Sequence, residues 1–183
     1  MSRLHLWYRV VISQDLIYKL NSKNIFQINR LDKAVLTCNT NAVVEDSKNV
    51  VFVLVLLELL SNQKPQILRA KKSVAAFKLR KLIALGGKVT LRNKKMYNWI
   101  DLFFFVVQPK VQEIKLLELN HRDNSFALNF GILSLASFPN LEFETNNLIK
   151  NLGFLVSFDS CEKKKVSTVL LLNAFQVPTI IKQ

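Results

Sequence analysis

Apolar residues recur at steps of three and four at the start of the chain, which is the spacing of one helix face. Between residues 4 and 20 this stripe consists of Trp7, Val10, Val11, Ile17 and Leu20. The pattern predicts one amphipathic helix whose stripe packs into the core.

Two short segments rich in β-branched and aromatic residues follow, and residues 25–28 and 33–38 both predict strands. Residues 48–60 are long enough for a helix, although their many valines favour a strand. We predict a buried helix that Asp46 or Ser47 caps. Its apolar run is 11 residues long and includes Glu58, whereas a membrane span needs about 20 residues, so we predict no transmembrane segment.

Residues 66–70 and 88–92 have the composition of two strands, and they flank a basic stretch at residues 71–85. Gly86 and Gly87 would supply permissive backbone where the chain enters the second strand. These features predict a long cationic loop between paired strands, which could reach away from the body of the protein.

Residues 96–107 predict a further helix, which Pro109 would end because proline lacks an amide donor and clashes with the preceding turn. The aromatic residues of this segment, Trp99 and residues 103–105, are typical of a helix that packs into a core. We therefore expect them to be buried.

Alternating apolar and small residues at 126–132 predict a half-buried strand, and residues 152–158 predict another. Ser160 would then cap a last helix at residues 161–174. Helices scattered among strands without a regular βαβ repeat favour an α+β fold, a mostly antiparallel sheet with helices on one face. No linker composition interrupts the 183 residues, so we expect a single domain.

Basic residues outnumber acidic ones by 26 to 13, and the excess is concentrated in one segment. Residues 59–100 contain no Asp or Glu but 11 of the cations, so the rest of the chain is nearly neutral. Solvated surfaces usually mix both signs because like charges repel. This segment predicts a docking surface for a large polyanion, and it disfavours an enzyme acting on a small neutral metabolite.

Residue types that build catalytic or metal sites are scarce. The only cysteines and histidines are Cys38, Cys161, His5 and His121. They offer no paired-ligand spacing for zinc and no disulfide framework. Gly86-Gly87-Lys88 lacks the spacing of a phosphate-binding loop. We therefore predict no enzymatic activity, no metal and no cofactor.

Three motifs in the basic segment carry a family resemblance. Residues 62–80 read NQKPQILRAKKSVAAFKLR, residues 87–92 read GKVTLR, and Met96-Tyr97 follows. In residue type and spacing they closely resemble the bacterial-type large-subunit ribosomal protein family "L-five", which binds 5S rRNA. The resemblance continues more weakly along the chain and fades after about residue 140.

The resemblance implies an antiparallel sheet backed by helices, with 5S rRNA and large-subunit rRNA lying on the exposed sheet face in the central protuberance. The basic loop, about residues 69–86, would contact peptidyl-site tRNA during translation. Further implied partners are neighbouring large-subunit proteins and a small-subunit head protein across the subunit bridge.

Carried over residue by residue, the resemblance implies two groups of RNA-contacting residues. The rRNA-binding group is Lys33, Thr37, Gln63, Lys88, Thr90 and Arg92. The tRNA-contacting loop group is Arg69, Lys71, Lys72, Ser73, Phe77, Lys78 and Arg80. Cations and hydroxyls bind phosphate and ribose, so these residues fit an RNA shape rather than read a base sequence.

The chain departs from the family pattern at three motifs that usually contain glycine, namely residues 38–42, 75–77 and 124–126. Thr37 also stands where the family usually has Asn. Four Gly and four Pro against 13 Phe is the bias of AT-rich codons, and the N-terminus shows no presequence. These features favour an organelle-encoded mitochondrial member over a plastid one.

Two other hypotheses stay open on the sequence. A free RNA-binding factor outside the ribosome would exist as a soluble pool, whereas the apolar residues 103–105 and 170–172 indicate surfaces that need a partner. A peripheral membrane protein would need an amphipathic helix beside the cations. Residues 71–85 offer only Val74, Phe77 and Leu82 as apolar anchors.

Overall fold

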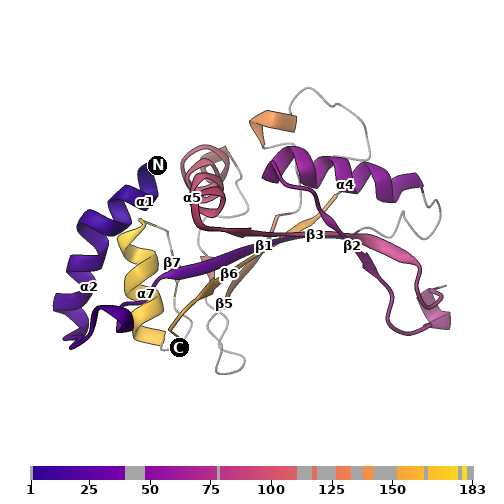
Figure 1. Ribbon diagram of the computed structural model, residues 1–183. Coiled ribbons are helices and arrows are strands. Elements are labelled where there is room, and N and C mark those ends of the chain that lie inside the picture. The colour runs from indigo at the N-terminus through magenta and orange to yellow at the C-terminus, as the bar shows by residue number, and fades with distance from the viewer. Residues whose placement is uncertain are drawn as a thin grey trace. The chain divides into compact units, whose positions relative to one another are not determined.

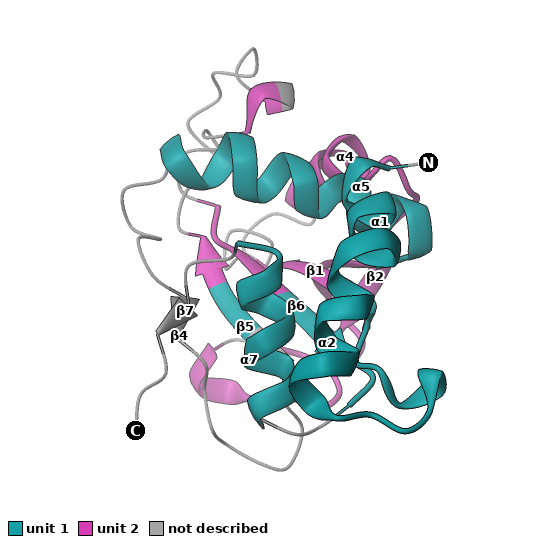
Figure 2. Cartoon of the chain, turned by 90° about the vertical axis from the view of Figure 1, so that its left-hand side faces the viewer, with its two compact units in different colours: residues 1–34, 91–130, 157–183 teal, residues 35–90, 131–156 magenta. Residues whose placement is uncertain are grey.

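The chain forms two compact units, coloured separately in Figure 2. The computed structural model describes residues 2–39, 48–77, 79–110, 117–118, 127–132, 138–141, 152–162, 165–176 and 179–180. Unit 1 comprises Met1–Ala34, Leu91–Phe130 and Ser157–Gln183, and unit 2 comprises Val35–Thr90 and Gly131–Val156. All four points at which the chain passes from one unit to the other fall inside β-strands.

Five strands form an antiparallel sheet in the order β2-β3-β1-β6-β5 (Figure 1). Their bounds are β1 (Leu31–Asn39), β2 (Gln66–Arg69), β3 (Ala84–Arg92), β5 (Ala127–Ile132) and β6 (Phe154–Ser160). β4 (Leu117–Glu118) and β7 (Thr179–Ile180) form a separate parallel pair. With the helices, this sheet confirms the predicted α+β fold, and each of its five strands overlaps one that the sequence predicts.

The described α- and π-helices are divided unequally between the two units. Unit 1 contains α1 (Arg3–Trp7), a π-helical stretch (Tyr8–Ile12), α2 (Ser13–Leu20), α5 (Asn93–Leu102), a second π-helical stretch (Phe103–Val107) and α7 (Lys165–Ala174), and unit 2 contains α4 (Lys48–Ser61). Within unit 1, α7 packs against α2 and α1 packs against α5. Among the described helices, none combines the length and the apolar character that a membrane span requires.

The N-terminal helix is confirmed, but its buried face is not the predicted one. Its buried residues are Leu4, Ile12 and Leu16, whereas Trp7 and Val10 of the predicted stripe are exposed. The π-helical stretch places more residues in one turn, so side chains that follow it rotate around the helix axis. A pattern with a constant period of 3.6 therefore assigns the wrong face.

The aromatic core of unit 1 is largely the expected one. Trp99 and Phe103 are buried and stack with ring centroids 5.1 Å apart, and Phe130 stacks on Phe103 at 5.0 Å. Phe105 differs, because it is about half exposed and lies under the Arg3 guanidinium, 4.7 Å from its ring centroid. This contact fastens α1 to the helix that follows α5.

Two local predictions were wrong. Residues 25–28 are not a strand, because Ile25–Gln27 form a 3-10 turn in which Phe26 is fully exposed. Ser160 does not cap the last helix either; it ends β6, and its Oγ donates to the carbonyl of Glu162, while α7 begins only at Lys165. The caps predicted at Asp46 and Ser47 lie outside the described residues.

In unit 2, close approach rather than backbone freedom explains the glycine pair of β3. Neither Gly86 nor Gly87 has a positive φ. A Cβ on Gly86 would collide with the carbonyl oxygen of Cys38, and a Cβ on Gly87 would lie 2.8 Å from a methyl group of Leu54 and 2.9 Å from one of Leu57. Glycine at both positions therefore lets β1 and α4 approach β3 closely.

Candidate nucleic-acid interface

The basic segment forms a β-hairpin in unit 2, as predicted. β2 pairs antiparallel with β3, with Gln66 opposite Lys88 and Leu68 opposite Gly86. The register shifts between Leu68 and Arg69, and this irregularity bends the hairpin where the loop begins. The hairpin is thus the support that carries the cationic loop.

Backbone hydrogen bonds organise the loop. Ala70 donates to the carbonyl of Ile83 at 2.9 Å, and near the tip Val74 and Leu79 exchange two bonds of 3.0 and 3.1 Å. The Ser73 hydroxyl accepts a further bond from the Lys81 amide at 3.0 Å. The loop therefore holds a second short bridge at its tip instead of running free.

Side chains of the loop point to solvent. Arg69, Lys71, Lys72, Ser73 and Arg80 are all at least partly exposed, and Phe77 is exposed over 70% of its surface. No carboxylate of the described ranges forms a salt bridge with these four cations. Lys78 lies outside the described residues. The loop thus presents uncompensated positive charge and an apolar tip.

Along β3, the candidate rRNA-binding residues occupy alternate positions. Lys88, Thr90 and Arg92 are half-buried or exposed, whereas Val89 and Leu91 between them are buried. Successive side chains of a strand point to opposite faces, so the three polar residues share one face. In unit 2 the opposite face of β3, that of Gly87, receives α4.

Gln63 and Thr37 complete the candidate group within unit 2. The Gln63 side chain donates from Nε2 to the carbonyl oxygen of Thr90 at 3.2 Å, which ties the segment after α4 to β3. This bond leaves its Oε1 as an acceptor. Thr37 is half-buried on β1, the neighbour of β3 in the sheet.

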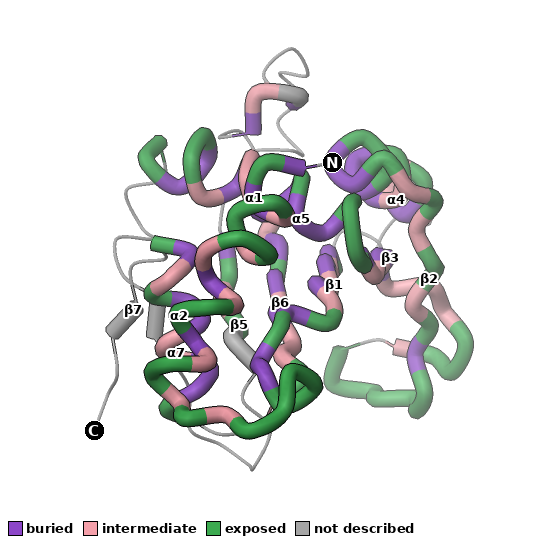
Figure 3. Tube along the Cα trace, turned by 60° about the vertical axis from the view of Figure 1, so that its left-hand side comes forward, coloured by how far each residue is buried: buried purple, intermediate pink, exposed green. Residues whose placement is uncertain are grey.

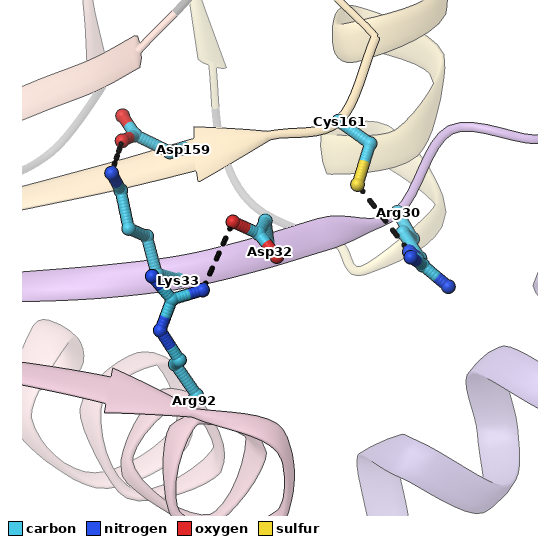
Figure 4. A network of polar contacts seen from close by, with 6 residues as sticks. All are labelled: Arg30, Asp32, Lys33, Arg92, Asp159 and Cys161. Atoms are coloured by element: carbon cyan, nitrogen blue, oxygen red, sulfur yellow. Dashed lines mark hydrogen bonds and ion pairs between the residues drawn. The ribbon is translucent and has the colours of Figure 1, made fainter.

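Lys33 and Arg92 belong to unit 1, and both are paired with carboxylates (Figure 4). Lys33 Nζ lies 3.0 Å from Asp159 Oδ2, and Arg92 Nη1 lies 3.2 Å from Asp32 Oδ2. All four side chains remain about one third exposed or more. Sequence reasoning missed both acids, because neither lies near its partner along the chain.

A third polar contact in Figure 4 joins Arg30 to Cys161. Arg30 Nε donates to Cys161 Sγ at 3.3 Å, and this bond raises the pKa of the guanidinium. Nearby, Tyr8 donates to the carbonyl of Asn29 at 3.0 Å, and burial raises the pKa of its phenol. The Arg30 contact holds the start of β1 to the end of β6, and the Tyr8 bond holds the N-terminal helix to the segment before β1.

The described residues offer no cluster of metal-binding side chains. No three His, Cys, Asp or Glu side chains in those ranges gather closely enough to hold a metal ion. An open pocket of about 830 Å³ in unit 1 is lined by residues that include Lys23, Phe26, Cys161 and Val166. Burial lowers the pKa of His5, the one described histidine, which stacks on Tyr97 with ring centroids 5.0 Å apart.

Comparison with known proteins identifies the family. The family model described as "Ribosomal protein L5" matches residues 24–80, and the model of the C-terminus of the same ribosomal protein family matches residues 84–179. The "Large ribosomal subunit protein uL5m" of Reclinomonas americana is 31% identical over 97% of this chain and 98% of its own length. The "Large ribosomal subunit protein uL5" of Dichelobacter nodosus is 32% identical over the same shares, and that of Mycoplasma capricolum is 32% identical over 97% of both chains.

Both family models and these relatives extend across the sheet and the basic hairpin. The resemblance that the sequence motifs indicate is therefore confirmed, as is the expectation of a structural protein rather than an enzyme. The chain belongs to the L5 family of ribosomal proteins, which are structural constituents of the large ribosomal subunit.

Proposed function

We propose that this protein binds 5S rRNA, or an RNA that takes its place, together with large-subunit rRNA in the central protuberance. Its basic loop contacts peptidyl-site tRNA as translation proceeds. Neighbouring large-subunit proteins and a small-subunit head protein across the subunit bridge complete its surroundings. The ribosome in question is that of a mitochondrion.

The exposed, acid-free loop is the observation that carries this proposal. Arg69, Lys71, Lys72 and Arg80 face solvent from a hairpin that its own backbone bonds support. Contacts of cations with phosphates depend on backbone charge and carry no base information. Such a loop suits a ligand that changes in sequence but not in backbone shape, as tRNA does.

The polar face of β3 supports the rRNA part of the proposal. Lys88 and Thr90, with Thr37 on the neighbouring strand, form a half-buried polar surface opposite the face that α4 covers. A lysine with hydroxyls at this spacing is suited to phosphates and ribose. Arg92 adds a planar cation at the end of the same strand.

The mitochondrial assignment rests on composition and on one relative. The bias towards Phe at the expense of Gly and Pro is that of AT-rich codons, and the mitochondrial-type protein of Reclinomonas americana is similar over nearly the whole chain. Bacterial relatives are similar to the same degree, so the location needs its own measurement.

Sedimentation of the tagged protein from a mitochondrial lysate, with and without magnesium chelation, tests role and ligand together. We expect co-migration with the large subunit and, after sequencing of the RNA that travels with the tag, a short 5S-like RNA. Co-migration with the large subunit but without that RNA would support the role in the subunit and would show that the ligand is not a 5S-like RNA. A slowly sedimenting free pool would favour the extraribosomal RNA-binding factor instead.

A further inference from the structure

Helix α4 of unit 2 is apolar on the face that it turns to solvent as well as on the face that it buries. Val53, Leu56 and Leu57 are each 1% exposed, whereas Val51, Val55 and Leu59 are 63%, 45% and 41% exposed. Figure 3 shows that buried and exposed stretches alternate along α4. Val51, Val55 and Leu59, called here the α4 stripe, are spaced by four and lie in one row along the helix.

A row of this kind is unusual on a surface that stays in water. A helix that is apolar all round is normally buried on all sides, and contiguous exposed apolar residues mark an interaction site. Within the described residues of unit 2, nothing buries the stripe. An exposed apolar row of this length is suited to contact with another molecule.

Charge argues against a nucleic acid or a lipid surface as that molecule. Between residues 49 and 63 the only ionisable side chain is Glu58, which is exposed beside Leu59. Phosphate backbones and anionic lipids are held by Lys and Arg, and a carboxylate repels both. A second copy docking through its own α4 is disfavoured as well, because that helix offers no Lys or Arg between residues 49 and 63 to pair with Glu58.

We propose that the α4 stripe packs against an apolar-faced helix of a neighbouring large-subunit protein, and that this helix places a Lys or Arg against Glu58. Side chains spaced by four form a ridge that fits the groove of a second helix, and a carboxylate at the rim of the contact selects a cation there. The inference requires only membership of the large subunit, so it stands apart from the proposed contacts with 5S rRNA and tRNA.

Photo-crosslinking in the assembled particle tests the occupant directly. A photoreactive amino acid is placed at Val55, large subunits are purified, and crosslinked peptides are identified by mass spectrometry. We expect a peptide from another large-subunit protein with apolar residues at steps of three and four and a Lys or Arg among them. The matched control carries the same group at Asn98, an exposed polar position on α5 in unit 1, and should not yield that peptide.

A crosslink from position 55 to any other kind of occupant would overturn the proposal. A crosslink from position 55 to rRNA, to lipid, to a second copy or to another segment of this chain would each do so. Absence of any crosslink in intact subunits would also do so, because the stripe would then be solvated in the particle.

Charge reversal supplies an independent test. Glu58→Lys should reduce the amount of the neighbouring protein retained in salt-washed subunits about tenfold, and reversal of the facing cation to Glu should restore it. Glu58 is exposed, so the thermal midpoint of the free protein should not change, which excludes misfolding as the cause. Equal retention in wild type and Glu58→Lys, or failure of the double reversal to restore it, would contradict the proposal.

The RNA content of the same subunits separates this inference from the proposed function. Glu58→Lys should leave the 5S-like RNA at its wild-type level while the neighbouring protein is lost. Loss of the RNA with retention of that protein would count against the α4 stripe as a protein site.

Discussion

The carbonyl oxygen of Cys38 on β1 lies where a Cβ of residue 86 would have to be, so Gly86 is what lets the two strands meet at this point. The side-chain oxygen and Cα of Asn39 lie 2.6 and 2.9 Å from the same position. Two of these three neighbours are backbone atoms, which cannot turn away as a flexible side chain does.

We expect Gly86→Ala to lower the free energy of unfolding by about 1–3 kcal/mol, because β1 and β3 must separate to admit the methyl group. Urea unfolding followed by circular dichroism measures the change. Gly131→Ala is the matched control, since its Cβ would meet nothing within 4 Å. A loss at Gly131 as large as at Gly86 would contradict the close-approach explanation.

Because Arg92 forms an ion pair with Asp32, variants of the two residues can separate the RNA-binding role of Arg92 from its structural role. Both side chains are about half exposed, so the pair contributes at most about 1 kcal/mol to stability. We expect Arg92→Ala to weaken binding of the co-purifying RNA about tenfold, because a charged hydrogen bond to phosphate is lost. Asp32→Asn should leave binding unchanged or tighten it, because a competing carboxylate is removed.

Affinity for that RNA at constant salt, measured with the thermal midpoint of each variant, checks this prediction. If the two variants weaken binding equally, Arg92 acts only through its pair with Asp32, and its assignment to the RNA surface fails.

Elements with a strong local pattern were predictable from the sequence. The apolar segment before Ser61 was long enough to identify the helix α4. The two strand-like segments that flank the basic loop identified the β2-β3 hairpin. Both follow from residues close together along the chain. The charge pattern and the family motifs likewise indicate the position of the loop.

Features that depend on distant residues or on unusual helix geometry were not predictable. Asp159 is remote from Lys33 in sequence and meets it only because β6 lies beside β1 in the sheet. The π-helical stretch at Tyr8–Ile12 leaves no mark in the hydrophobic period, so Trp7 was assigned to the core although it is exposed. The sequence drew attention to Gly86, but the reason why glycine is needed there became clear only from the position of the Cys38 carbonyl.

The loop cations predict the salt dependence of RNA binding. Replacing Lys71, Lys72 and Arg80 by Ala should reduce the slope of log affinity against log salt by about 2–3, because each phosphate contact releases close to one counterion. The tRNA-dependent steps of translation should be impaired more than subunit assembly. The control replaces Arg9, Lys19 and Lys23, three cations of unit 1 that are at least partly exposed. An equal change of slope in that control would show that net charge alone, and not the loop, binds the RNA.

The two cysteines should differ sharply in reactivity. Cys38 is buried, and burial raises its pKa to about 11, whereas Cys161 is exposed and lies beside Arg30. We expect iodoacetamide at about pH 8 to modify Cys161 in the folded protein and to reach Cys38 only after unfolding, because the thiolate is the reactive form. Peptide mass spectrometry resolves the two sites. Modification of Cys38 at the rate of Cys161 without unfolding would refute its burial.

The raised pKa of Cys38 also predicts a pH dependence of stability. The folded state retains the thiol proton up to about pH 11, while the unfolded chain loses it near pH 9, so stability is complete below about pH 9 and declines above it. By about pH 11 the decline attributable to this thiol is about 2 kcal/mol. Comparing urea unfolding of wild type and Cys38→Ala across about pH 8–11 isolates this contribution from those of Tyr8 and Tyr97, whose pKa values are also raised. Parallel curves for the two proteins would rule it out.

The four passages of the chain between the units, each inside a strand, have a consequence for how the protein is made. Unit 2 consists of Val35–Thr90 and Gly131–Val156, with Leu91–Phe130 of unit 1 synthesised between its two pieces. Neither unit is complete when its first segment leaves the translating ribosome, and β6, which contributes to both, is among the last strands to emerge. Folding must therefore wait for nearly the whole chain, as expected when contacts join residues far apart in sequence. A chain truncated before β6 should fold neither unit. Digestion of that truncated chain with a protease should therefore yield no resistant fragment that corresponds to one unit.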